Sequence, residues 1–502
     1  MASAMLSRVI GLVRVKYIAL AFGRDTNADA FLAAFQLPDM IAYFLIGGAL
    51  SITLVTMLTR YRDTGREAEG ERTLSVILST MLLVLGAAIV VAEVLAPWYT
   101  RTFFQFDAAT AALCTHLTRI LLPAQLCFFA SGVYGAVLVV RKQFYAQAVA
   151  PLIYNLGTIL GGVLLARRLG VSSMAYGTVA GALAGPLLVN LFGARRAGVR
   201  FGFVLDWQDE GLREWVRLSI PLMLGFSLIT ADTWIINHFA SAGAGAVSVM
   251  TYAKQLFTAP MAVLAQAAGA ASMPFFANLW AQKRHYEFAN EVADAVSRVA
   301  SLGLLAASGM MALAVPAVDL VMRGGKYSVA DTRQTAAYFA IFTITLFLWS
   351  AQAIYQRAFF AAGNTMTPMI AGTVVTLVSL PVYALLNHLY GVGGLAMASD
   401  IGITLQTVVL AVLLHKERMV SLASVDYREL GRCLASGLAA GSAAWAVALG
   451  VGHLLHAQTR WADAVELVAG MAVWVGLAGI LLERLGSALP RAMMRRLGLR
   501  RT

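Results

Sequence analysis

The chain has 502 residues, of which 59% are hydrophobic and 13% charged, and its formal net charge at pH 7 is +12. Soluble domains carry about 25% charged residues, so this composition excludes an ordinary soluble protein. The positive charges are spread over short segments between apolar stretches and form no single patch, which argues against nucleic acid as a partner.

Apolar stretches of roughly 20 residues recur along the whole chain, and each is long enough to cross a hydrocarbon core of ~30 Å. Lipid leaves open strands without hydrogen-bond partners, so we expect every stretch to be a helix. The pattern predicts an all-α integral membrane protein with about fourteen transmembrane helices, at 3–22, 29–59, 73–97, 110–140, 146–166, 173–193, 216–240, 246–279, 291–322, 331–361, 366–388, 392–416, 430–455 and 462–484.

The first apolar segment is unusual because it carries three cations. It includes "SRVIGLVRVKYIAL", in which Arg8, Arg14 and Lys16 fall within nine positions. A cation near the bilayer centre costs at least roughly 2.5–3.5 kcal/mol, so the polar face of this helix must meet water, an anion or a carboxylate. The cations also interrupt the apolar run that a signal peptide needs, and we expect the segment to remain in the mature protein.

Two interpretations of this cationic face stay open. A structural ion pair, such as Arg14 with Asp39, would neutralise both charges, as intramembrane ions usually do. Alternatively, the guanidinium binds an anionic ligand, because Arg holds phosphate with a bidentate fork. The excess of cations over acids in the early spans favours the anionic ligand.

The chain also contains a weak internal repeat. The segment "DAFLAAFQLPDMIAYFLIGGALSITLVTML" from Asp29 is similar in rhythm to "SVMTYAKQLFTAPMAVLAQAAGAASMPFF" from Ser248. Transporters are often built from two such halves, with the binding site at their interface near the midplane. We therefore expect two six-helix lobes at 1–193 and 218–416, an amphipathic cytoplasmic linker at 194–217, and two further helices with a basic tail at 417–502.

Prolines interrupt several of the long spans. Pro38, Pro260 and Pro274 each remove a backbone hydrogen bond and are expected to kink the helix that contains them.

The distribution of positive charge predicts the topology. If the amino terminus is cytoplasmic, the cytoplasmic loops and tail hold 25 Lys and Arg residues, whereas the opposite loops hold eight. Cytoplasmic loops carry the excess of Lys and Arg in membrane proteins. We therefore expect both termini to be cytoplasmic and the number of helices to be even.

The sequence offers no pattern for metal, cofactor or nucleotide chemistry. The three cysteines lack metal-ligand spacing, the seven histidines form no HExxH motif, and no Walker loop or dinucleotide fingerprint occurs. Asp232, Asp400 and Glu466 are isolated carboxylates in predicted spans. Each is a candidate for binding a coupling ion, or is simply capped or facing water.

Several segments resemble a known family of transporters. "SRVIGLVR", "FGRDTNADAFLAAFQLP" and "GGALSITLVTML", and later "YQRAFFAAGNTMTPMIAG", are similar to the MurJ (MviN) family of bacterial lipid II flippases. The resemblance implies a flippase that moves a polyprenyl-diphosphate-linked sugar precursor from the cytoplasmic to the periplasmic leaflet of the inner membrane. It also implies alternating access of two lobes, with membrane potential or a coupling ion as the energy source, and no enzymatic activity.

The resemblance also implies which residues bind the substrate. Arginines of a cationic cavity hold the diphosphate in the family, and its first-helix arginines match Arg8 and Arg14 here. Other positions differ, because Ala42 and Tyr43 stand where the family usually has an arginine pair, and a Lys–Gln pair replaces the charged pair of "ADRL". The candidate substrate-binding residues are Arg8, Arg14, Asp29, Tyr43, Lys254 and Gln255.

Three other functions are weighed against lipid II flipping. The altered cavity positions make a flippase for another lipid-linked glycan, such as an exopolysaccharide or O-antigen unit, the main alternative. A cation-coupled drug exporter would need an acidic site instead of a basic one. A membrane glycosyltransferase would need a sizeable aqueous loop with catalytic carboxylates, and the longest loop offers only the amphipathic "DWQDEGLREW".

Overall fold

The computed structural model describes residues 2–46, 49–224, 228–262, 264, 267–455, 459–487 and 489–490. Side chains are described for these residues except 2–8, 45–46, 49–52, 221–224, 229, 267–268 and 270–271. Within the described residues every regular element is a helix, apart from one isolated bridge between Gly324 and Tyr327. The predicted all-α class is confirmed.

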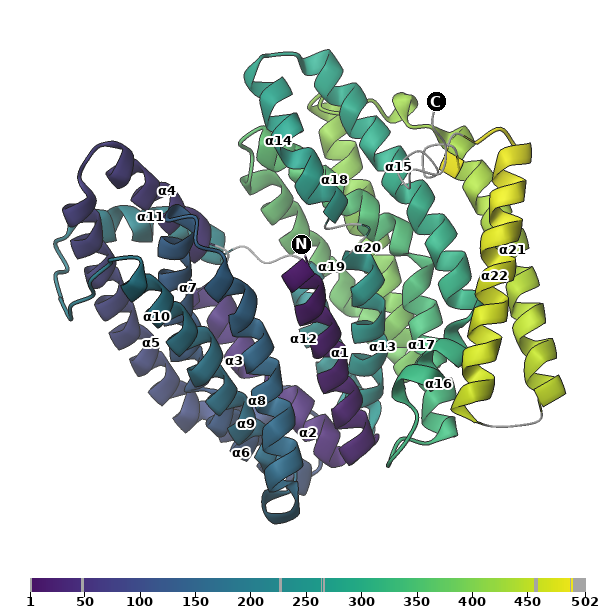
Figure 1. Cartoon of the computed structure of the whole chain (residues 1–502), viewed down its shortest axis with the longest axis horizontal. Helices are drawn as coiled ribbons and strands as arrows, with labels where there is room; N and C mark the ends of the chain where they lie inside the picture. The colour runs from purple at the N-terminus through teal and green to yellow at the C-terminus, as the bar shows by residue number, and fades with distance from the viewer. Residues whose placement is uncertain are drawn as a thin grey trace. The chain divides into compact units, whose positions relative to one another are not determined.

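The chain divides into two compact units, and the first comprises Met1–Phe226 together with Ala240–Ser248. Its helices, labelled in Figure 1, are α1 (Ala2–Phe22), α2 (Thr26–Ala34), α3 (Gln36–Ile41), the π-helical turn η1 (Ala42–Ile46), α4 (Ala49–Asp63), α5 (Glu67–Phe103), α6 (Ala108–Leu121), α7 (Ala124–Val140), α8 (Tyr145–Leu169), α9 (Ser172–Ala182), the π-helical segment η2 (Leu183–Val189), α10 (Asn190–Arg196) and α11 (Glu210–Leu224).

The second unit comprises Ser227–Phe239 and Val249–Thr502. Its helices are α12 (Leu228–Ala240), α13 (Ala246–Met261), α14 (Ala267–Ala281), α15 (His285–Ala312), α16 (Ala314–Met322), α17 (Val329–Ile344), α18 (Leu346–Ala361), α19 (Met366–Tyr390), α20 (Val392–Lys416), the short 3₁₀ turn η4 (Leu422–Ser424), α21 (Tyr427–Leu455) and α22 (Arg460–Arg484). The ends of α12 and α13 that flank the 240–248 segment cluster with the first unit.

The helices account for the predicted spans. Each of the fourteen predicted segments coincides with one helix or with consecutive helices, except that positions 47–48, 225–227, 263 and 265–266 lie outside the described residues. In the described part of the chain, nine helical stretches are long and apolar enough to cross a bilayer, and the pair α17 and α18, bent by 46°, forms a tenth. The helix α1 differs from these spans because its 21 residues include three cations.

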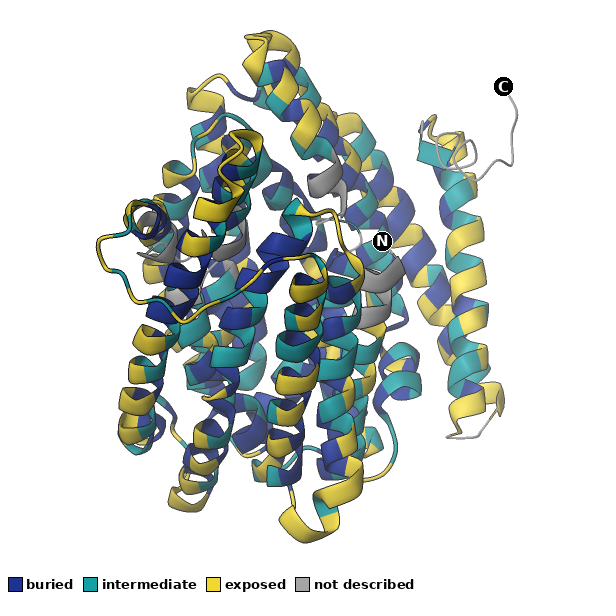
Figure 2. Cartoon of the chain, turned by 60° about the vertical axis from the view of Figure 1, so that its left-hand side comes forward, coloured by how far each residue is buried: buried dark blue, intermediate teal, exposed yellow. Residues whose placement is uncertain are grey.

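Helix α8 places small or polar residues inside and large apolar residues outside. Figure 2 shows exposed and buried residues alternating along the helices of the chain. On α8, Asn155 and Thr158 are buried, whereas Leu160 and Leu164 are exposed. This inverted pattern suits lipid as the solvent, because small residues let helices approach closely and apolar side chains face the acyl chains.

Glycines bring α8 and α9 into close contact in the first unit. A Cβ placed on Gly161 would lie 2.5 Å from the Cα of Gly177, and one on Gly157 would lie 2.5 Å from the Cα of Gly181. Real Cβ atoms do not approach backbone so closely. The two helices can therefore pack at this distance only because both positions lack side chains.

The predicted span 29–59 is broken where its proline lies. Pro38 cannot donate a hydrogen bond to the carbonyl of Ala34, and the helix is divided into α2, α3 and η1 around this point. The hydroxyl of Thr118 on α6 donates to the Ala34 carbonyl oxygen at 3.4 Å. The carbonyl that the proline leaves free is thus paired by a neighbouring helix, as lipid-embedded backbone requires.

The predicted amphipathic linker belongs to the first unit, where α11 packs on α4 and α5. Arg60 forms a bidentate pair with Glu214, with its Nη1 2.9 Å from Oε1 and its Nη2 2.5 Å from Oε2. On the apolar side of α11, Trp215 is 1% exposed and joins the core of the unit. The linker is therefore held by both a polar and an apolar contact.

Candidate functional site

The first unit contains a pocket of about 450 Å³ beside the broken helix α2–α3. Residues of α3, η1, α6, α7, α8 and α9 line it. Its three ionisable side chains are Asp39, Tyr43 and Tyr154. The full lining is Phe35, Pro38, Asp39, Ala42, Tyr43, Leu121, Ala124, Gln125, Phe128, Tyr154 and Thr178. The pocket beside the helix break is therefore mostly apolar, with a few polar side chains in its lining.

Arg14 lies next to this pocket. Its Cζ is 5.8 Å from the centroid of the Tyr154 ring, within range of a cation–π interaction. Its charge also attracts the carboxylate of Asp39. The Arg14 Nε atom is buried and has no hydrogen-bond partner among the described residues, so the two neighbours leave one donor of the guanidinium unused.

The other predicted residues of the first unit occupy different positions. Tyr43 lines the pocket and packs edge-on against Phe44. Arg8 lies on α1, less than two turns before Arg14, but its side chain falls outside the described residues. The pocket therefore gathers Tyr43 with Asp39 and Tyr154, and Arg14 adjoins it.

Asp29 acts as a backbone cap. Its side chain is 1% exposed and accepts hydrogen bonds from the backbone N–H groups of Gly245 at 2.6 Å and Ser248 at 2.7 Å. Arg24 donates to the Gly245 carbonyl at 3.1 Å in the same region. Arg24 and Asp29 therefore both hold the 240–248 segment in place.

Lys254 forms an ion pair within the second unit. Its Nζ lies 2.5 Å from Asp232 Oδ2 and 2.8 Å from the hydroxyl of Thr233, both on α12. The hydroxyl of Tyr383 donates to Asp232 Oδ1, and that of Ser399 donates to Oδ2 at 3.0 Å. Asp232 is 1% exposed and therefore depends on these donors.

A small pocket of about 90 Å³ lies beside this ion pair, and both Lys254 and Gln255 line it. The side chain of Lys254 is 17% exposed, so part of this side chain faces the recess. Asp400 is separate from the ion pair and accepts a hydrogen bond from Thr345 at 2.5 Å. Of the three isolated carboxylates of the sequence, Asp232 is the one that pairs with Lys254.

Sequence reasoning missed Tyr154, Tyr383 and Ser399. They come from distant helices, and a hydroxyl inside a span gives no signal of its partner. The available signal was the pair of opposite charges on consecutive helices, Asp232 and Lys254, because buried ions require partners.

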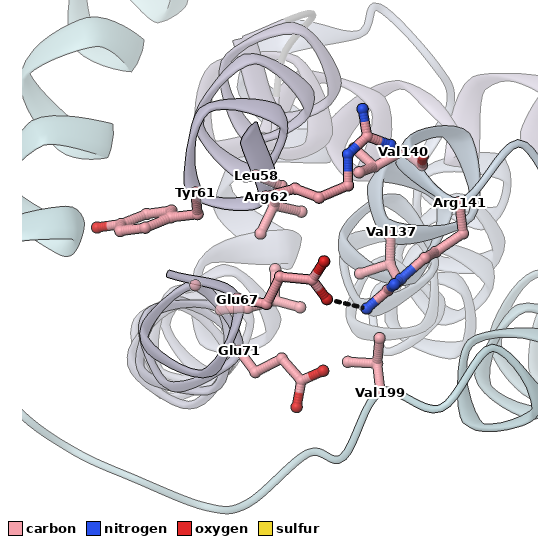
Figure 3. A pocket seen from close by; sticks show the side chains of 11 residues that line it. Leu58, Tyr61, Arg62, Glu67, Glu71, Val137, Val140, Arg141 and Val199 are labelled. Atoms are coloured by element: carbon pink, nitrogen blue, oxygen red, sulfur yellow. Dashed lines mark hydrogen bonds and ion pairs between the residues drawn. The ribbon is translucent and has the colours of Figure 1, made fainter. Parts of the chain in front are cut away.

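A third recess lies at the α4–α5 turn, and Figure 3 shows its lining. It measures about 40 Å³, and Arg141 pairs with Glu67 across it at 2.8 Å. Arg62 donates to the Val140 carbonyl at 2.8 Å. The recess is small and its basic groups are occupied, so it joins α4, α5 and α7 structurally. No group of three or more metal-ligating side chains occurs among the described residues.

Comparison with known proteins gives a consistent result. The family described as "Lipid II flippase MurJ" matches residues 18–464. A protein of Bdellovibrio bacteriovorus named "Probable lipid II flippase MurJ" is 26% identical over 500 residues, covering 96% of this chain and 93% of the relative. The protein of Burkholderia cenocepacia named "Lipid II flippase MurJ" is 26% identical over 430 residues, covering 82% of each chain.

Solved structures show the same fold. A structure titled "Lipid II flippase MurJ, inward closed conformation" aligns with a TM-score of 0.79 at 18% identity, covering 96% of this chain and 98% of the other. An inward-facing multidrug resistance MATE family transporter of the MOP superfamily aligns with a TM-score of 0.67 at 15% identity, covering 82% of this chain and 94% of the other.

Proposed function

The chain belongs to the lipid II flippase MurJ family, and from this premise we propose that it moves lipid II from the cytoplasmic to the periplasmic leaflet of the inner membrane. Its relatives along nearly the whole chain carry this name. The chain is a multi-pass membrane transporter and not an enzyme. Its substrate is a lipid-linked precursor of peptidoglycan, drawn from the bilayer.

Arg14 is the proposed anchor for the diphosphate of the substrate. The observation that carries this assignment is its buried Nε donor, which lacks a partner among the described residues and lies beside a pocket of about 450 Å³. A guanidinium with unused donors binds phosphate oxygens well, because the hydrogen bonds are charge-assisted. Arg8 precedes it on α1, Tyr43 lines the same pocket, and both are proposed to contact the substrate.

Lys254 and Gln255 are proposed as contacts from the second unit. Lys254 is neutralised by Asp232, so it must leave this carboxylate, or share it, when it meets an anionic substrate. We propose that this exchange is where a coupling ion acts, because Asp232 would then need another cation. Asp29 is proposed to support the site indirectly. Both of its carboxylate oxygens accept hydrogen bonds from the backbone of Gly245 and Ser248, so they hold this backbone in place.

Transport is proposed to occur by alternating access of the lobes 1–193 and 218–416, with the linker 194–217 and both termini in the cytoplasm. The charge asymmetry of 25 against eight Lys and Arg residues supports this orientation. A cysteine introduced at Arg168, which is exposed in the last turn of α8, should react with a membrane-impermeant thiol reagent from the periplasmic side.

The experiment that tests the function is rescue of a bacterium depleted of its lipid II flippase. Growth supported by this chain, together with appearance of lipid II in the outer leaflet, is the expected result. Normal expression without rescue would instead favour transport of another lipid-linked glycan. Ala42 and Tyr43 are the observation behind that second candidate, because both line the pocket where the resembling family usually has an arginine pair.

A further inference from the structure

A pocket of about 560 Å³ lies in the second unit, apart from the residues assigned to the substrate. It lies where the carboxyl-terminal ends of α16 and α21 meet the amino-terminal ends of α17 and α22. Both α21 and α22 are long and apolar enough to cross the bilayer. Their ends therefore place this pocket near the depth of the lipid headgroups.

The inner wall of the pocket contains two acids and one arginine. Arg323 lies between two carboxylates, with its Nη1 2.7 Å from Asp319 and its Nη2 3.4 Å from Asp463. Asp319 is 4% exposed, and its carboxyl group also interacts directly with that of Asp463. One guanidinium therefore lies against two neighbouring acids.

Two further charged side chains line the pocket without any described ion pair or hydrogen bond. They are Glu466 on α22 and Arg333 on α17. The Glu466 carboxylate rests against Gly452 of α21, where an added Cβ would lie 2.7 Å from its Oε1. Glu466 is half-buried, so its carboxylate needs compensation, whereas Arg333 is exposed at the mouth of the pocket. The pocket thus offers one unpaired carboxylate and one exposed guanidinium to an external ligand.

We infer that this pocket binds the headgroup of a zwitterionic phospholipid that carries a phosphate and a primary ammonium group. The ammonium pairs with Glu466 beside the acidic wall, and the phosphate pairs with Arg333. The surplus of acids over arginines in the lining favours such a lipid over an anionic one. The volume accommodates a headgroup, and the exposed Trp461 and Leu454 next to the pocket supply an apolar border for the acyl chains.

The inference is tested by native mass spectrometry of the full-length protein, titrated with phosphatidylethanolamine, phosphatidylcholine or phosphatidylglycerol. The unmodified chain is expected to prefer phosphatidylethanolamine, because only this lipid offers both a phosphate and an ammonium with free N–H donors. Glu466→Gln should weaken phosphatidylethanolamine binding about tenfold, the loss of one charged hydrogen bond, and leave phosphatidylglycerol unchanged. Arg333→Gln should weaken all three lipids.

Gly452→Ala provides a second, independent variant. Its new methyl group displaces the flexible end of Glu466 and leaves the charge in place, so it should reduce phosphatidylethanolamine binding without removing a carboxylate. Glu483→Gln is the matched control, because Glu483 is exposed at the opposite end of α22. Unchanged phosphatidylethanolamine binding in both Glu466→Gln and Gly452→Ala would overturn the inference. Soluble phosphoethanolamine binding as tightly as the lipid would overturn the assignment to a bilayer lipid.

Discussion

Lys254 Nζ lies 2.5 Å from Asp232 Oδ2, and this ion pair joins α13 to α12 inside the second unit. Asp232 receives two further hydroxyl donors, from Tyr383 on α19 and Ser399 on α20. Three helices, α13, α19 and α20, therefore bond to one carboxylate of α12. The sequence suggests Lys254 as a free contact for the substrate, but in this structure Lys254 is paired with Asp232.

This convergence predicts a non-additive effect of mutation. Lys254→Met should lower the free energy of unfolding by about 3 kcal/mol, because a buried carboxylate loses its counter-charge. Asp232→Asn combined with Lys254→Met should recover part of the loss, since neither charge then remains unpaired. Melting temperatures of the purified protein in detergent measure both effects. If the losses in melting temperature of Lys254→Met and Asp232→Asn simply add up in the double variant, the pairing is contradicted.

Asp29 is predicted to act through stability instead of substrate affinity. Asp29→Ala leaves the N–H groups of Gly245 and Ser248 without an acceptor, at a cost of about 1–3 kcal/mol each. Asp29→Asn keeps one oxygen acceptor and should cost less. A thermal shift assay gives this order, and native mass spectrometry with lipid II should show unchanged affinity for the Asn variant. Weakened binding at unchanged stability would show that Asp29 contacts the substrate.

Arg14 is predicted to show the opposite behaviour. Arg14→Ala should abolish rescue of the depleted strain while membrane insertion and melting temperature change little, because the side chain forms no complete set of internal bonds. Arg14→Lys should retain only part of the activity, since an ammonium lacks the bidentate fork. Arg168→Ala, which removes an exposed arginine of α8, is the matched control. Full rescue by Arg14→Ala would exclude this residue from the site.

Hydropathy predicts the helical segments well because the bilayer requires each span to satisfy its own backbone hydrogen bonds. The same argument does not locate partners between spans. Asp29 is 216 residues from Gly245, whose backbone it caps, and only the fold brings them together. The presence of buried ions in the spans was predictable, but the choice of Asp232 for Lys254 depends on the rotation of α12 and α13 about their axes.

The local irregularities were predictable only in part. Pro38 predicts an interruption, and the chain is broken there. The π-helical turn at Ala42–Ile46 packs against α7 and α11, and the hydroxyl of Thr118 on α6 pairs the freed carbonyl of Ala34. Both features depend on contacts between helices, which hydropathy does not predict. The pocket beside Arg14 lies next to that break, so hydropathy did not predict it. The charge of Arg14 itself was evident from the sequence.

The docked linker predicts a pH dependence outside the membrane. Bidentate hydrogen bonds from Arg60 hold the pKa of Glu214 below its ordinary value near 4.5. A lowered pKa in the folded state means that the stabilisation is complete at neutral pH and is lost as the pH falls through the folded value. The pair is half exposed, so it contributes less than about 1 kcal/mol. Glu214→Gln should reproduce the acid effect at pH 7.

Hydrogen exchange measures this loosening directly. Amides of the segment 199–210, which leads into α11, should exchange several-fold faster in Glu214→Gln than in the unmodified chain, while α8 stays unchanged. Glu69→Gln removes the Arg66–Glu69 pair within a single helical turn and should leave the segment protected. Equal protection in both variants would mean that Trp215 and the apolar contacts of α11 hold the linker without the ion pair.

The close contact between α8 and α9 predicts that the same glycine-to-alanine change destabilises the protein at this contact and not elsewhere. Gly161→Ala places a methyl group 2.5 Å from the Cα of Gly177 and 2.6 Å from the carbonyl oxygen of Ser173, where only backbone can move. Overpacking of this kind costs about 1–3 kcal/mol. Gly86→Ala, in the middle of α5, meets no atom within 4 Å and should leave the melting temperature unchanged or slightly raised. Because both changes replace a helical glycine by alanine, helix propensity is matched, and the difference in melting temperature isolates the helix contact. Equal melting temperatures for the two variants would show that α8 and α9 do not pack at this distance in the membrane.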